Sequence, residues 1–233
     1  MECQVKPFYF YKMKLLPILS LILMLGVSCQ KDVKTEPDVD KQMENEAPKS
    51  ESEQLSTRIE KAYNIDKYKT ETFLKYSVDV NLNDDTYAKA VLKYNILERI
   101  LNVKANGVQS TMTNTSEKTE QEEFLFDLNE IYTLPFLIQN ENFQLISKND
   151  SIVTSKYASD QTRISYTINT HPLTEIIQSL NLDKDGSILD DTTINFEKFI
   201  TVNRIPVSMI WNIYRDDKQI GAVNISRISY PKS

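Results

Sequence analysis

The sequence predicts an α+β protein built on a strongly curved antiparallel sheet, a half-barrel of about nine strands with two or three helices covering its concave face. Two observations predict this fold. Apolar and polar residues alternate over long stretches, as in strands that are buried on one face only. Short turn sequences separate these stretches, which favours antiparallel pairing of neighbours. We expect a single domain of this kind over residues 54–233.

The domain is expected to open with one helix and two long strands. Apolar residues at helical spacing predict a short amphipathic helix over residues 55–63. Strict alternation then predicts strands over 74–82 and 88–96, joined by a turn at 83–85. The two strands therefore form the start of a meander.

A tight hairpin and a second helix are expected next. Asn106-Gly107 is the strongest hairpin signal in the chain, because both central residues of a type I′ turn need positive φ. It predicts paired strands over 99–104 and 108–113. Between residues 119 and 139 the apolar spacing becomes helical.

The C-terminal half is expected to be mostly strand, with one more helix. Pro172 is typical of a first helical turn, and the apolar residues that follow predict a helix through Leu180. The other expected strands are 143–147, 151–157, 162–169, 194–202, 207–214 and 220–230.

The first 28 residues resemble a signal peptide. Basic residues precede an apolar run from Leu15 to Leu25, and small residues then lead to Cys29. The run is shorter than the roughly 20 apolar residues of a membrane-spanning helix. Met13 is the expected start, because Met13-Lys14-Leu15-Leu16 is a more conventional beginning than Met1 to Tyr11.

Cys29 is the expected site of lipidation. The preceding Leu25-Gly26-Val27-Ser28 resembles a bacterial lipobox, although the commonest form has Leu at the third position before Cys. The alternative is an ordinary secretory leader, which would leave the exported chain with one unpaired thiol. Cys3, the other cysteine, lies upstream of the leader. Lipidation explains the single cysteine, and it would anchor the protein to a membrane.

Residues 29–53 are expected to be the lipidated cysteine and a disordered tether. The segment is rich in charged and polar residues and has too few apolar residues to offset the entropy cost of ordering. Gln30-Lys31-Asp32 resembles the short signal that sends some Bacteroidota-type lipoproteins to the cell surface. A tether that simply begins with polar residues explains these three residues equally well.

Composition argues against several classes of function. The formal net charge of −6 disfavours nucleic acid as a partner. His171 is the only histidine and the folded part contains no cysteine, so neither a catalytic triad nor a zinc site of the usual composition is expected. The acid pairs Glu122-Glu123 and Asp190-Asp191 are typical of a solvated surface. We expect no enzymatic activity and no cofactor.

One segment resembles part of a calcium-binding loop. Asp183 and Asp185 offer oxygen ligands at alternate positions, and Gly186 follows them, as in the first half of an EF-type loop. Thr192 stands where the second half needs a bidentate Glu. An acidic turn between a helix and a strand is the other interpretation, and we expect no metal site.

The lipobox cysteine, polar tether, opening helix and meander together resemble the bacterial outer-membrane lipoproteins with an unclosed β-barrel, the LolA/LolB/LppX-like group, here of Bacteroidota type. The best-fitting segments are Phe196–Phe199, Val202–Val207 and Gly221–Ser226, which are similar to the closing strands of these half-barrels. No catalytic motif comes with the resemblance.

The resemblance implies a monomeric protein, lipid-anchored in the outer membrane, whose concave face holds a lipid or other hydrophobic ligand under a helical lid. An alternative is that the same inward residues form a plain core, which would favour a surface-exposed module binding a protein or glycan. A soluble type of lipid carrier would not be anchored, so a shuttle role is not expected. The inward residues expected to bind the ligand are Tyr76, Val78, Leu92, Tyr94, Leu101, Trp211 and Ile213.

Overall fold

A computed structural model describes residues 50–138, 142–159 and 164–231. The expected signal peptide, Cys29 and nearly all of the expected tether lie outside the described residues. The elements in chain order are α1 (Glu51–Ala62), α2 (Ile65–Lys69), β1 (Phe73–Leu82), β2 (Asp85–Asn95), β3 (Ile100–Ala105), β4 (Val108–Met112), α3 (Glu120–Thr133), the 3₁₀ helix η1 (Leu134–Phe136), β5 (Phe143–Lys148), β6 (Val153–Ser159), β7 (Ile164–Thr170), β8 (Ile177–Asp183), β9 (Thr192–Val202), β10 (Ile205–Arg215) and β11 (Lys218–Ser229).

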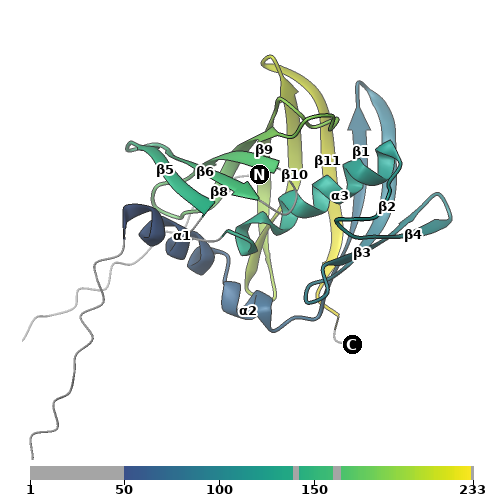
Figure 1. Cartoon of the computed structure of the whole chain (residues 1–233), viewed down its shortest axis with the longest axis horizontal. Coiled ribbons are helices and arrows are strands. Elements are labelled where there is room, and N and C mark those ends of the chain that lie inside the picture. Colours follow the sequence, from purple (N-terminus) through teal and green to yellow (C-terminus); the bar gives the residue numbers. More distant parts are fainter. Residues whose placement is uncertain (1–49, 139–141, 160–163, 232–233) are drawn as a thin grey trace, which may run out of the picture. The chain divides into compact units, whose positions relative to one another are not determined.

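The eleven strands form one curved antiparallel sheet that does not close into a barrel (Figure 1). Their order is β4-β3-β2-β1-β11-β10-β9-β8-β7-β6-β5, so β4 and β5 are the two edges. Strands that follow one another in the chain pair, except for β4 and β5, and β1 pairs with β11 inside the sheet. The α+β class and the open, curved sheet are confirmed, with eleven strands in place of about nine.

Two-residue turns connect four pairs of neighbouring strands in the meander. Both turn residues have positive φ, the conformation of a type I′ turn, whose twist matches that of the strands. The predicted turn at Asn106-Gly107 is confirmed, with φ of 50° and 81°. The other turns of this kind are Asn83-Asp84, Asn203-Arg204 and Asp216-Asp217.

The predicted helix after Pro172 is wrong, because these residues form a turn and then β8. Leu173 is 85% exposed, whereas Ile177, Leu180 and Leu182 are buried. A register shift at Asn169/Thr170 lets residues three apart face the core from a strand. The same spacing fits a helix, and pairing with β7 and β9 on both sides favours the strand.

The N-terminal helices differ from the expectation at their ends. α1 begins at Glu51 because Ser50 and Glu53 form a capping box, so residues 51–53 of the expected tether are helical. Asn64 has a φ of 53° and ends this helix, and the short α2, which the sequence did not predict, follows. No helix among the described residues is long and apolar enough to span a membrane.

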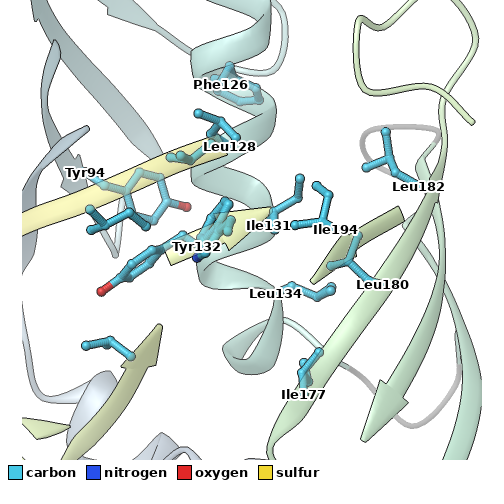
Figure 2. Close-up of a cluster of buried hydrophobic side chains, with 14 of the residues drawn as sticks. Tyr94, Phe126, Leu128, Ile131, Tyr132, Leu134, Ile177, Leu180, Leu182 and Ile194 are labelled. Atoms are coloured by element: carbon cyan, nitrogen blue, oxygen red, sulfur yellow. The ribbon is translucent and has the colours of Figure 1, made fainter. Parts of the chain in front are cut away.

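Helix α3 lies across the concave face of the sheet (Figure 1). A capping box of Thr119 and Glu122 begins it, which confirms the helix predicted between residues 119 and 139. Figure 2 shows its side chains pointing to both halves of the sheet, with Tyr132 toward one half and Ile131 toward Ile194 of the other. The helix therefore fills the concave face as a central layer of the core.

Candidate functional site

The residues predicted to bind a ligand all lie in the buried core. Their exposed fractions run from 0% for Leu92, Leu101 and Ile213 to 6% for Tyr94. β1–β3 supply five of the seven, and β10 supplies Trp211 and Ile213. The structure therefore uses these residues as core beneath α3, as the alternative interpretation expected, and a role in ligand binding stays a prediction.

A small apolar opening lies where α3 and η1 meet the β9–β10 hairpin. Its cavity volume is about 30 Å³, which holds roughly two water molecules. Sites for lipid-sized ligands occupy about 300 Å³ or more, so the concave face is closed in this state. The lining residues are Tyr63, Ile131, Tyr132, Pro135, Phe136, Ile177, Phe196, Phe199, Pro206, Val207, Ser208 and Trp211. We call this feature the rim pocket.

Aromatic rings surround the rim pocket. The ring of Tyr132 stacks on that of Tyr76 with centroids 4.7 Å apart, and it lies 6.2 Å from Trp211. On the other side, Phe136 stacks on Tyr68 at 3.7 Å. Tyr76 and Trp211 lie on strands whose alternation predicted them as inward residues. The other rings come from α2, α3, η1 and the residue after β11, where no alternation marks them as part of a site: Tyr68, Tyr132, Phe136 and Tyr230.

Three buried hydrogen-bond donors in this region have no partner among the described residues. They are the indole N–H of Trp211 and the hydroxyl groups of Tyr132 and Tyr230. The hydroxyls of Tyr132 and Tyr230 lie close enough for each to shift the pKa of the other. Burial raises the pKa of Tyr132 and Tyr230, so both remain neutral donors. A buried donor without a partner costs about 1–3 kcal/mol, so the group calls for an acceptor.

The side of α3 that faces the β8–β9 turn carries an ionic network. Lys184 Nζ lies 2.5 Å from Asp127 Oδ1 and 3.0 Å from Glu123 Oε1. The hydroxyl of Ser187 donates to Asp127 Oδ2 at 2.7 Å. Burial raises the pKa of Asp127 and outweighs these bonds. Burial lowers the pKa of Lys184, but the two carboxylates outweigh it and raise that pKa.

Glu130 lies one turn further along α3, and its carboxyl group has fewer hydrogen-bond partners than that of Asp127. Its Oε2 is buried without a hydrogen-bond partner among the described residues. Burial, followed by the charge of Asp127, raises the pKa of Glu130 to about 8. The carboxyl group is therefore largely protonated at neutral pH.

The other candidates from the sequence do not come together as a site. The segment before Asp183 is strand β8, so the helix that a calcium loop of EF type requires is absent there. The described residues hold no group of three His, Cys, Asp or Glu side chains placed to bind a metal. His171 Nδ1 accepts a hydrogen bond from the backbone of Leu173. Glu122 caps α3.

The fold and the rim pocket together define an open antiparallel half-barrel whose apolar concave face is closed by a helix. No protein-family model and no curated protein matches this chain. Several solved structures are similar to it. Three of them have sequence identities of 7–10% and TM-scores of 0.45–0.47, which leave function to be argued from this chain alone.

These structures come from different bacteria. A putative outer membrane lipoprotein-sorting protein domain from Vibrio parahaemolyticus has 10% identity and a TM-score of 0.47, covering 74% of this chain and 93% of its own. A LolA superfamily protein from Nitrosomonas europaea has 7% identity and a TM-score of 0.46, with coverages of 78% and 94%. A DUF1329 family protein from Desulfovibrio piger has 8% identity and a TM-score of 0.45, with coverages of 76% and 92%.

Proposed function

We propose that this chain is a lipid-anchored cell-envelope protein, non-enzymatic, that binds a lipid or other hydrophobic ligand between its sheet and α3. The observation that carries the proposal is the rim pocket, an apolar and aromatic opening at the end of the helix that covers the concave face. In this proposal α3 is a lid, and the structure is the closed state. The anchor is Cys29, and the membrane is the outer membrane.

The way in which α3 is held supports a lid. Discrete polar contacts connect it to the sheet at separate points along the helix. Gln121 donates to the carbonyl of Tyr87 at 2.7 Å, and Asn129 accepts from the hydroxyl of Tyr76 at 3.1 Å. The ionic network around Asp127 makes the third connection. Breaking these contacts would uncover the apolar faces of β1–β3 and β10.

Native mass spectrometry tests the proposal. We would use the full chain carrying Cys29→Ala, which is expected to be exported without its anchor and to need no detergent. We expect one lipid to copurify with the protein, or one added monoacylglycerol or phospholipid to bind. A mass of the free chain that does not change after adding fatty acids, monoacylglycerols or phospholipids would contradict the proposal.

A pair of surface variants shows whether the rim pocket is the entrance. Phe199 is 39% exposed and lines the pocket, so Phe199→Glu is expected to weaken lipid binding by placing a charge at the opening. Leu97 is 74% exposed in the turn between β2 and β3, and Leu97→Glu is the matched control. Equal effects of the two variants would place the entrance elsewhere.

The filled concave face favours a second candidate, a surface-exposed interaction module. The small volume of the rim pocket is what a permanently closed core would show. A larger recess of about 410 Å³ lies among polar residues of the β1–β2 and β10–β11 turns. A lipid-free protein in the mass measurement would favour this candidate, with a protein or glycan as the partner.

A further inference from the structure

We infer that the hydrophobic ligand carries an uncharged carbonyl group, as in an acyl ester or amide, which accepts hydrogen bonds from Trp211 Nε1 and the Tyr132 hydroxyl. This inference rests on the proposed function and specifies its ligand class. The occupant of the rim pocket would be an acylated amphiphile, and neither a plain hydrocarbon nor a fatty-acid anion.

The positions of the two donors point to one shared acceptor. Both residues line the rim pocket, Tyr132 from α3 and Trp211 from β10. Their ring centroids are 6.2 Å apart and the ring planes differ by 29°. Both side chains are more than nine-tenths buried, at 7% and 2% exposed. A chain that enters between α3 and the β9–β10 hairpin meets both donors.

The lack of a partner for these groups argues for a polar ligand atom. An indole N–H is a donor only, so a hydrocarbon would leave it unpaired, whereas a carbonyl oxygen with two lone pairs can accept from two donors. The hydroxyl of Tyr230 lies beside that of Tyr132, and the single proton of the Tyr132 hydroxyl would be donated to the ligand. A ligand oxygen at this place would satisfy the two donors that line the rim pocket, Trp211 Nε1 and the Tyr132 hydroxyl.

The lining of the rim pocket favours an uncharged acceptor. None of its twelve residues is charged. Nine are aliphatic or aromatic, two are prolines, and the twelfth is Ser208. Burying a carboxylate without a cation costs far more than burying a carbonyl group. An ester or amide therefore matches the donors without the desolvation penalty of an anion.

A matched set of probes tests the inference on the full chain carrying Cys29→Ala. The probes are 1-monoolein, its ether analogue 1-O-oleylglycerol, which lacks only the carbonyl oxygen, and oleate. Binding is measured by displacement of N-phenyl-1-naphthylamine fluorescence, so that no signal depends on Trp211. We expect the ester to bind roughly tenfold more tightly than the ether and more tightly than oleate, as two net hydrogen bonds imply.

Three substitutions to phenylalanine show whether the preference for the ester over the ether depends on the two donors. Trp211→Phe and Tyr132→Phe should each reduce the ester-to-ether ratio to about threefold, while leaving ether binding nearly unchanged. Tyr87→Phe removes a half-buried hydroxyl on β2, beside Phe124 near the start of α3, and should keep the full ratio. Circular dichroism confirms that each variant is folded. Because Trp211→Phe and Tyr132→Phe should lower the same affinity ratio, each provides an independent test of the inference.

The outcomes separate the inference from the proposed function. Equal affinities for ester and ether, or tighter binding of oleate than of the ester, would overturn the inference while the proposed function stands. A ratio that persists in both donor variants would also overturn it. No displacement by any of the three probes would overturn the proposed function and the inference with it.

Discussion

At the scale of single residues, the two buried carboxyl groups of α3 differ in how the structure satisfies them. Asp127 is fully buried and is paired with Lys184 and Ser187. Glu130 has a buried oxygen without a partner among the described residues. A carboxyl group of this kind is stable in the fold mainly as the neutral acid.

The protonation of Glu130 predicts how stability depends on pH. Its pKa rises from 4.5 in the unfolded chain to about 8 in the fold, first through burial and then through the charge of Asp127. The positive charges of Lys184, Lys118 and Arg99 lower this pKa but do not outweigh burial. Between these values the folded protein holds a proton that the unfolded chain has released. This contribution to stability is therefore complete below about pH 4.5 and is lost as pH rises through 8.

Glu130→Gln is the variant that checks this dependence. We expect the wild-type chain to lose up to about 5 kcal/mol of stability from this group between pH 4.5 and 8, and the variant to lose much less. The measurement is urea denaturation at several pH values. Glu117→Gln, at an exposed glutamate before α3, is the control. Identical pH profiles for wild type and Glu130→Gln would contradict the assignment.

Residue-level prediction from the sequence succeeded on strands and failed on helices. Tyr76 and Trp211 were identified because alternation shows which face of a strand is apolar. Glu123, Asp127 and Glu130 lie at helical spacing, a pattern that normally indicates a solvent-exposed face. α3 is buried on nearly all sides, as only its tertiary surroundings show.

At the scale of elements, the turns were the most predictable part and the β7–β8 connection the least. Asn106-Gly107 specifies its own backbone conformation, so its turn needs no tertiary information. β8 was mistaken for a helix because Ile177 and Leu180 satisfy both periodicities once the register shifts. A single sequence does not show such a shift.

Replacing glycine with alanine should cost different amounts of stability at two positions of the sheet. Gly107 has a φ of 81° and open space around it, so Gly107→Ala should cost about 1 kcal/mol through backbone strain alone. A Cβ on Gly221 of β11 would lie 2.5 Å from the Asn81 carbonyl oxygen of β1 and 2.5 Å from Leu82. Gly221→Ala should cost about 3 kcal/mol, because backbone must move.

Chemical denaturation of the two variants gives the comparison. The denaturant concentration at the unfolding midpoint should fall little for Gly107→Ala and clearly more for Gly221→Ala. The dependence of the unfolding free energy on denaturant concentration should be similar for both variants. Similar shifts for both would mean that the β1–β11 contact can relax without cost.

At the scale of the whole molecule, the arrangement of a covered, open sheet was predictable, but what fills its concave face was not. Alternating strands and tight turns specify a meander, and a meander of this length curves. Whether α3 or a ligand fills the concave face depends on side-chain volumes across elements far apart in sequence, such as Tyr132 and Trp211.

The proposed anchor gives a prediction for the intact protein in its host. Cys29→Ala should move the protein from the membrane fraction to the soluble fraction of the envelope, since a removed thiol cannot be acylated. The measurement is cell fractionation with immunodetection, together with the intact mass of the membrane-bound form. Ser28→Ala keeps the cysteine and serves as the control. Unchanged membrane association of Cys29→Ala would contradict lipidation at this residue.

The pairing of β1 with β11 has a consequence for biosynthesis. A ribosome finishes β1 at residue 82, but the strand that completes its hydrogen bonds ends at residue 229. The early meander β1–β4 can form while translation continues, and its β1 edge stays open until β11 has been made. The sheet of the nascent chain therefore remains incomplete until β11 is available to pair with β1.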